Sequence, residues 1–219
     1  MAISDLHGKI NKSLEKYLEQ NKIDLLIISG DISNFGPTQL IQDNLNKIST
    51  YNTPIIAIPG NCDPQDTTDA INNSQAQNAH KENIKIENII ITGFGGSNPT
   101  PFDTPTEYTD EELYTQLDTL IKQTQVEKEN IHILLTHAPP LNTKADEIPD
   151  GAHVGSEAVR KIIEKYQPDI NLCGHIHEAK SIDKIGKTTI LNPGEMANSH
   201  ASIIEIDENN NITCEIIKI

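Results

Sequence analysis

The fold is constrained most by an alternation of short apolar runs and amphipathic stretches in the first third of the chain. A strand stub at 2–4 and apolar runs at 23–29 and 54–58 are separated by stretches whose apolar residues recur at helical spacing, the first of them over 9–21. Short apolar strands joined by helices are typical of a largely parallel sheet that is covered by helices. The sequence therefore predicts an α/β fold.

The same pattern continues to the end of the chain. We expect strands at 84–91 (one or two segments), 131–136, 170–172, 188–191, 201–206 and 212–219, helices starting after Thr109 or Asp110 and after Ser156, a short helix with a loop at 66–80, and long loops at 93–107 and 141–154. The loop at 93–107 is expected to face a substrate, because long loops in compact domains are often functional. No internal repeat or linker interrupts the pattern, so we expect one domain over residues 1–219.

Side chains that bind metals recur in the turns that follow five of these strands. They are Asp5 and His7; Asp31; Asn61; His137; and His175 with His177. Sites in open α/β sheets form outside the carboxyl ends of the strands, so these side chains can converge on one crevice. A ligand set of imidazole, carboxylate and amide without thiolate suits Mn, Fe or Zn and argues against a cysteine-rich structural zinc site. Seven ligands exceed one tetrahedral site but fit two ions that share a carboxylate, a recurring arrangement in phosphoryl hydrolysis.

The charge and cysteine content exclude several classes of function. A net charge of −15 argues against stable nucleic-acid binding and against binding to a membrane surface, which both need basic patches. With Arg160 as the single arginine, phosphate cannot be held by arginine forks. Three widely spaced cysteines form no disulfide framework, and there is no leader or membrane-length apolar run, so we expect a cytoplasmic protein. The strand stub at 2–4 is short enough to indicate a clipped first strand or a late start.

Five motifs in order resemble those of the calcineurin-like metallophosphoesterase superfamily. They are Asp5-x-His7, Gly30-Asp31-x-x-Asn34, Gly60-Asn61-Cys62-Asp63, the strand-end His137, and Gly174-His175-x-His177. The Gly-Asn-Cys-Asp form, the loop at 93–99 and Asn192-Pro193-Gly194 are most similar to small prokaryotic, especially archaeal, members. The resemblance implies a four-layer α/β/β/α sandwich of two mixed β-sheets flanked by helices.

The resemblance also implies a role for each motif residue. Asp5, His7 and His177 would bind a first ion, and Asn61, His137 and His175 a second, with Asp31 bridging the two. Two divalent ions are implied, with Mn expected first and Fe, Zn, Ni or Mg as alternatives. The implied reaction is attack of a metal-activated water or hydroxide on phosphorus, and Asp63 would orient a ligand.

Two positions depart from the family pattern. Many members have His where this chain has Cys62, and that His is thought to protonate the leaving group, a contribution typically worth about 10²–10⁴-fold. His153, in the loop at 141–154, could substitute as proton donor or phosphate contact. Asn34 replaces a residue that is often acidic, and together with Asn61 and Cys62 it is expected to contact the substrate.

These observations predict a dinuclear phosphoesterase that acts on phosphodiesters or activated phosphoesters, because the usual acid is missing. The expected partner is a small phosphoester substrate, and the oligomeric state is left open. A phosphomonoesterase acting on a small molecule or phosphoprotein is the first alternative. The second alternative is a degenerate family member that serves as a non-catalytic metal-binding scaffold, similar to the retromer subunit of this fold. The intact ligand set argues against this alternative. An exonuclease is disfavoured by the acidic charge.

Overall fold

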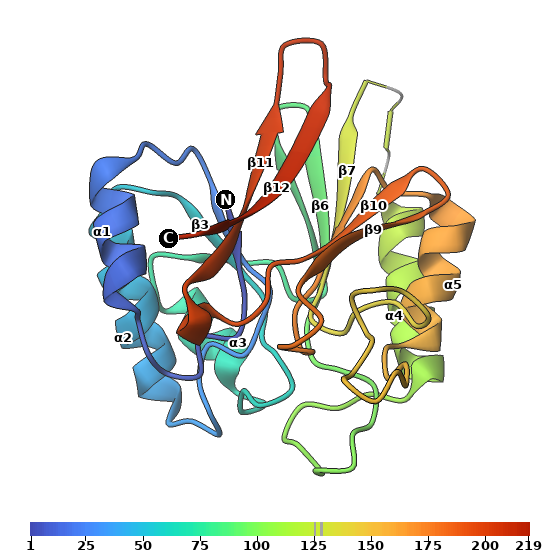
Figure 1. Ribbon diagram of the computed structural model, residues 1–219, viewed down its shortest axis with the longest axis horizontal. Helices are drawn as coiled ribbons and strands as arrows, with labels where there is room; N and C mark the ends of the chain where they lie inside the picture. The colour runs from blue at the N-terminus through green and yellow to red at the C-terminus, as the bar shows by residue number, and fades with distance from the viewer. Residues whose placement is uncertain (125, 128) are drawn as a thin grey trace.

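The computed structural model describes residues 1–124, 126–127 and 129–219. Two six-stranded sheets pack against each other and are flanked by helices on both sides (Figure 1). This arrangement confirms the predicted four-layer sandwich of two mixed sheets.

The first sheet is built mainly from the N-terminal half of the chain. Its strands, in spatial order, are β12 (Ile212–Lys218), β11 (His200–Ile206), β1 (Ala2–Ile3), β2 (Leu26–Ile28), β3 (Ile55–Ala57) and β4 (Gln77–Asn78). Strands β1 to β4 are parallel, whereas β11 and β12 run antiparallel to their neighbours. The carboxyl ends of β1, β2 and β3 therefore lie along one edge of this sheet.

The second sheet follows in the chain and has a parallel centre as well. In spatial order it consists of β5 (Glu82–Ile86), β6 (Ile89–Phe94), β7 (Ile131–Thr136), β8 (Ile170–Leu172), β10 (Thr188–Asn192) and β9 (Ser181–Ile185). Strands β6, β7, β8 and β10 are parallel, and the outer strands β5 and β9 are antiparallel.

Two helical layers cover the outer faces of the sheets (Figure 1). The first sheet carries α1 (Lys12–Gln20), α2 (Thr38–Ser49) and α3 (Thr67–Asn72), and the second carries α4 (Asp110–Gln123) and α5 (Glu157–Tyr166), while a 3-10 turn, η1 (Met196–Asn198), precedes β11. Thr109 caps α4 in a capping box and Ser156 caps α5, as the sequence predicts. No helix in the described ranges is long and apolar enough to cross a membrane.

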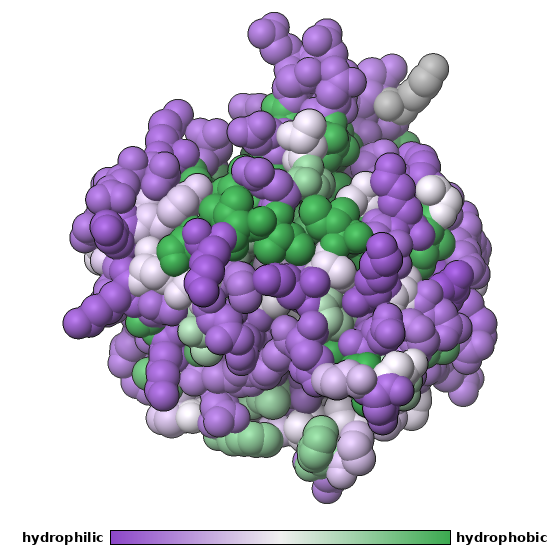
Figure 2. Space-filling model, viewed as in Figure 1, coloured by the Kyte–Doolittle hydropathy of each residue, from purple (hydrophilic) through white to green (hydrophobic). Residues whose placement is uncertain are grey.

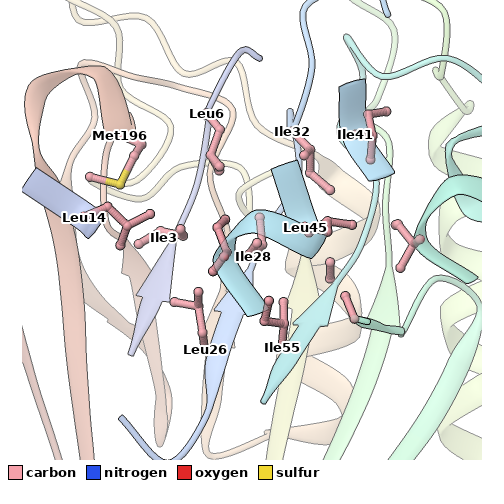
Figure 3. Packing of buried hydrophobic residues seen from close by; sticks show 14 of the residues in the cluster. Ile3, Leu6, Leu14, Leu26, Ile28, Ile32, Ile41, Leu45, Ile55 and Met196 are labelled. Carbon is pink, nitrogen blue, oxygen red and sulfur yellow. The ribbon is translucent and has the colours of Figure 1, made fainter. Parts of the chain in front are cut away.

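The short apolar strands alternate between two apolar layers. Leu26 and Ile28 of β2 pack toward α1 and α2, whereas Ile27 between them packs into the layer between the two sheets. Figure 3 shows the first of these layers, in which strand residues such as Ile55 lie near Leu45 of α2. Successive strand residues point to opposite faces, so a strand buried on both faces must be apolar at every position.

The predicted helix at 9–21 begins three residues too early. Asn11 is the N-cap of α1, because its side chain accepts a hydrogen bond from the backbone two residues further on. The segment before it is held by the turn after β2, where the Gly8 N–H donates to the Ile32 carbonyl (2.8 Å). The first residues of the predicted helix therefore belong to the connection between β1 and α1, where the Lys9 N–H donates to the Leu6 carbonyl.

The strand predictions need three further corrections. Residues 84–91 form two strands, within the one or two segments predicted, but β6 continues to Phe94 into what was expected to be loop; Gly93 lies within this strand because a Cβ there would overlap the Ala79 backbone. Strand β4 lies in the stretch predicted as helix and loop, and β9 was not predicted. Both are outer strands with polar residues and lack an apolar run.

The outer strands β9 and β12 of the two sheets contact each other on one side of the molecule. Figure 2 shows a band of apolar side chains across this face, over β12 and the strands beside it. Ile216 and Ile217 of β12 are partly buried, and Ile182 of β9 is 37% exposed.

Candidate metal centre

The seven predicted ligands lie at the carboxyl ends of neighbouring strands. Asp5 and His7 follow β1, Asp31 follows β2 and Asn61 follows β3, while His137 directly follows β7 and the pair His175 and His177 follows β8. The first sheet thus supplies both carboxylates and the amide, and the second sheet supplies three of the four imidazoles. Because the sheets pack face to face, the two sets of turns meet.

Four of these side chains form a compact group, here called the open group: Asp5, His7, Asp31 and His177. Each offers one ligand atom, and the four atoms lie within 4.8 Å of one another. The Nε2 atoms of His7 and His177 are 3.0 Å apart, and Nε2 of His177 is 3.5 Å from an Asp5 carboxylate oxygen. Both imidazoles of this group are partly exposed. The spacing and the donor types fit a divalent ion.

The remaining three side chains, Asn61, His137 and His175, are called the deep group. His137 is fully buried, and its Nε2 lies 2.9 Å from Asn61 Oδ1. The rings of His137 and His175 are in edge contact, with centroids 5.1 Å apart. Asp31 lies between the two groups, with Oδ2 3.8 Å from His7 Nε2 and Oδ1 3.4 Å from His137 Nε2.

Three ligands are oriented by hydrogen bonds on the side away from the centre. The Nδ1–H of His137 donates to the Ser29 carbonyl (2.7 Å), and Nδ1 of His177 lies 3.2 Å from the Glu195 carboxylate. Each contact leaves Nε2 facing the centre, as in metal sites where the second ring nitrogen is held by a carbonyl or carboxylate. Asn61 donates from Nδ2 to the Thr104 hydroxyl (2.9 Å), which turns Oδ1 inward.

Two glycines allow the turns that carry the predicted ligands to approach each other closely. A Cβ at Gly60 would overlap the carboxylate of Asp31, and one at Gly174 would overlap the hydroxyl of Ser4 beside Asp5. The glycines of the Gly-Asn and Gly-His motifs are therefore needed for contact between turns from different strands.

Four of the seven side chains stand on strained backbone. Asp5, His7, Asp31 and His175 have φ values of 56°, 46°, 49° and 71°. Non-glycine residues in this left-handed region cost about 1–3 kcal/mol each, and such strain clusters at functional sites. Four strained residues at one edge of the sheets lower the stability of the fold, so stability does not explain them. The convergence of their side chains on one point does.

Burial and mutual charge set the ionisation of the centre. Burial opposes the charge of Asp31, but the neighbouring His137 and His7 hold its pKa well below the usual range. Burial likewise opposes the charge of His137, and the Asp31 carboxylate overcomes it and raises the pKa of His137 to about 9. For His175, burial and the nearby His137 lower the pKa to about 4. The pKa shifts of His137 and Asp31 thus favour an ion pair between these two side chains, and burial disfavours a charge on His175.

Asp63, predicted to orient a ligand, joins two of the turns. Its fully buried carboxylate accepts hydrogen bonds from the backbone N–H groups of Ile32, Ser33 and Gly60, and from the Ser33 hydroxyl. Burial and the charge of Asp31 raise the pKa of Asp63 to about 6. It acts on the backbone beside Asp31 and Asn61, which makes it a positioning residue.

The three predicted substrate and acid residues lie around the centre in different environments. Cys62 is half-buried, and its backbone N–H donates to Asp31 (2.8 Å), while burial and Asp31 raise the pKa of its thiol far above the usual value. Asn34 is exposed on the turn after β2. His153 lies in the loop before α5, with Nδ1 2.7 Å from the buried carboxylate of Asp146. The ring of His153 thus pairs with Asp146 rather than with a predicted metal ligand.

Sequence reasoning missed Thr104, Glu107, Asp146 and Glu195. Thr104 holds Asn61, and Glu107 in turn accepts hydrogen bonds from the backbone and hydroxyl of Thr104. Glu195 directly follows the Asn192-Pro193-Gly194 motif, which was singled out for the resemblance alone. These residues act from loops distant in sequence, and their spacing to the motifs carries no periodic signal.

Comparisons with known proteins point to one family. A family model described as calcineurin-like phosphoesterase matches residues 1–179, a range that includes all seven predicted ligands. Uncharacterized protein MJ1162 of Methanocaldococcus jannaschii is 42% identical over 197 residues, which is 88% of this chain and 86% of that protein.

Solved structures share the fold at low identity. TT1561 of Thermus thermophilus is 17% identical with a TM-score of 0.73, over 98% of this chain and 96% of that one. A putative 5'-nucleotidase from Staphylococcus aureus, solved in complex with alpha-ketoglutarate, is 15% identical with a TM-score of 0.62, over 99% of this chain and 53% of that one. At these identities the likeness shows the fold alone.

Proposed function

The chain belongs to the calcineurin-like phosphoesterase family, and from this premise we propose that it is a dinuclear metal-dependent hydrolase of small phosphodiesters or activated phosphoesters. The observation that carries the proposal is the position of Asp31. One oxygen of its carboxylate faces the open group and the other faces the deep group. A carboxylate shared in this way supports two adjacent ions rather than one.

The two groups would hold one ion each. Asp5, His7 and His177 would bind the first, and Asn61, His137 and His175 the second, with Asp31 between them. Bound divalent ions supply Lewis-acid neutralisation of phosphate charge and lower the pKa of water. Manganese is our first choice of ion, since carboxylate, amide and imidazole ligands suit it.

The protein side chains contribute orientation. The hydrogen bonds of His137 to Ser29 and of Asn61 to Thr104 fix the ring and the amide before any ligand arrives. The contact of His177 with Glu195 aims its Nε2 in the same way. A preformed set of dipoles and charges is the usual source of electrostatic stabilisation in phosphoryl transfer.

The preference for diesters and activated esters rests on Cys62. Its thiol occupies the position where many family members have an imidazole, and the raised pKa makes it a very weak acid. Good leaving groups depart without a proton donor, whereas alkyl monoesters need one. His153 would act as donor to a substrate that reaches it, because Asp146 orients its Nδ1 and raises the pKa of the ring.

A phosphomonoesterase is the second candidate. It is supported by the pairing of His153 with Asp146, which supplies a proton donor elsewhere in the site, and by the fold likeness to the putative 5'-nucleotidase. A non-catalytic scaffold is not supported, because all seven ligand positions are occupied by residues that bind metals.

The test is metal analysis combined with a paired assay. Purified protein should contain up to two transition ions per chain and, with added Mn, should hydrolyse bis(p-nitrophenyl) phosphate faster than p-nitrophenyl phosphate. Asp31→Asn is the inactive control. A metal-free protein without Mn-dependent turnover would refute the proposal, and faster monoester hydrolysis would select the second candidate. Cys62→His should raise turnover of an alkyl monoester such as glycerol phosphate, because it restores a proton donor that the p-nitrophenyl leaving group does not need.

A further inference from the structure

Two of the three phenylalanines in the chain are exposed to water. Phe94 is 1% exposed, whereas Phe35 is 59% exposed and Phe102 is 80% exposed. The chain has no tryptophan, so these two side chains are a large part of its aromatic surface. Exposed apolar side chains are common singly, but an aromatic ring held on an ordered loop beside a polar centre is a typical ligand contact.

Phe35 is fixed next to Cys62. Its N–H donates to the Cys62 carbonyl (3.0 Å), and its φ of 62° places it in the left-handed region. The same turn is anchored by Ser33, whose hydroxyl donates to Asp63 and accepts a hydrogen bond from the Gly36 N–H. The backbone at Phe35 is therefore strained and held by hydrogen bonds, unlike that of a loosely held surface residue.

Phe102 is connected to Asn61 through a second set of hydrogen bonds. Its N–H donates to the Thr100 hydroxyl, and Thr100 and Thr104 both donate to the Glu107 carboxylate. Thr104 also accepts the hydrogen bond from Asn61. The loop backbones that carry the two exposed rings are thus linked by hydrogen bonds to the adjacent residues Asn61 and Cys62.

The loops that carry the two rings lie at the same end of the molecule. In Figure 1 the blue loop before α2 and the green loop before α4 both extend below the strands, and Figure 2 shows apolar side chains at this lower edge. This is the edge where the carboxyl ends of β2 and β6 and the candidate metal centre are found.

We propose that Phe35 and Phe102 form a subsite for a planar aromatic group of the substrate, so that the enzyme acts on small nucleobase-bearing phosphoesters. This inference rests on the proposed function, since the phosphate of the same molecule would lie at the metal centre. Bases stack on aromatic side chains without the help of basic residues, which suits a chain with one arginine. The net charge of −15 restricts the ligand to one or two nucleotides, because a polyanion would be repelled.

A matched pair of substrates tests the subsite. The 2,2,2-trifluoroethyl esters of adenosine 5'-monophosphate and of ribose 5-phosphate carry the same activated, non-aromatic leaving group and differ by the base alone. The Mn-loaded wild-type protein should favour the adenosine ester in kcat/KM by about tenfold or more, mainly through KM. Phe35→Ala and Phe102→Ala should each reduce that ratio several-fold, and Phe35→Leu should not restore it, because a leucine of similar apolarity has no ring face.

Val126→Ala is the control for loss of an exposed apolar side chain, since Val126 is 40% exposed and lies between α4 and β7, at the end of β7 opposite to His137. It should leave the ratio unchanged. Equal kcat/KM for the two esters in the wild-type protein, or a ratio that both Phe variants leave intact, would overturn the subsite.

A binding measurement separates failure of the subsite from failure of the proposed function. Ethenoadenosine monophosphate fluoresces, and the protein has no tryptophan to interfere. Adenosine monophosphate should displace the probe at concentrations about tenfold lower than ribose phosphate does, even if neither trifluoroethyl ester is hydrolysed. Equal displacement would refute the subsite, whereas preferential displacement without any hydrolysis would retain it and refute the esterase.

Discussion

The open and deep groups use the same kinds of ligand at different depths. His137 and Asn61 of the deep group are buried, whereas His7 and His177 of the open group are partly exposed, as is His175 of the deep group. Both carboxylates, Asp5 and Asp31, are buried. His137 and Asn61 are therefore part of the packed interior, and the other three imidazoles border the solvent. An ion in the deep group should exchange more slowly, because solvent reaches it less easily.

The largest effect is expected where the two groups meet. Asp31→Asn keeps the size of the side chain but removes the charge that both groups share, so both ions should bind weakly. Turnover of bis(p-nitrophenyl) phosphate should fall by at least about 10³-fold, and metal analysis should find less than one ion per chain. Retention of one full equivalent would show that one group binds its ion independently of Asp31.

The free energy of unfolding of the metal-free protein should vary with pH because of His137 in the deep group. A histidine whose pKa is raised from 6.5 to about 9 on folding contributes stability that is complete below pH 6.5 and is lost as the pH rises through 9. Chelator-treated protein should lose about 3 kcal/mol of unfolding free energy over that window. Urea denaturation at both ends measures the loss, and His137→Gln should abolish most of it.

Replacing one histidine from each group should separate folding from metal binding. His137→Gln leaves the Ser29 carbonyl without its buried partner, and unfolding free energy at neutral pH should fall by about 2 kcal/mol. His7→Gln removes a partly exposed ring and should change stability by less than about 0.5 kcal/mol. Both variants should lose one ion. Equal destabilisation would contradict the contrast between a packed and a surface group.

The smallest effect on metal binding is expected for Thr104, which contacts the predicted ligand Asn61 and not the ion. Thr104→Val keeps the shape of the side chain but removes the hydroxyl that accepts from Asn61. Affinity for the deep ion should fall about tenfold, as is usual when the residue that orients a ligand is changed. Thr100→Val, which alters the same loop without touching Asn61, is the matched control. Metal titration at constant ionic strength distinguishes them.

The strand pattern predicted a parallel sheet covered by helices, with the seven side chains at strand ends, for a physical reason, whereas the four-layer sandwich was implied by the family resemblance. Strands such as β2 are apolar at every position because both faces are buried, and the polar residue that ends each run marks the sheet edge. Strands β4 and β9 were missed because outer strands with one exposed edge need no such run.

The contacts that orient the site were beyond sequence reasoning. Glu195 reaches His177 from a turn after β10, and Thr104 reaches Asn61 across 43 residues. Each is an ordinary polar loop residue in its local context. Their roles depend on how loops from two sheets pack together, which no local period or motif encodes.

The hydrogen bonds of Asp63 have a consequence for how the protein acquires its ions. This carboxylate joins the turns of Asp31 and Asn61 through protein hydrogen bonds alone, so these bonds contribute to the distance between the two turns. Under the proposed function, metal binding would order little additional chain and would carry a small conformational-entropy cost. The fold should therefore persist when a chelator removes the proposed ions.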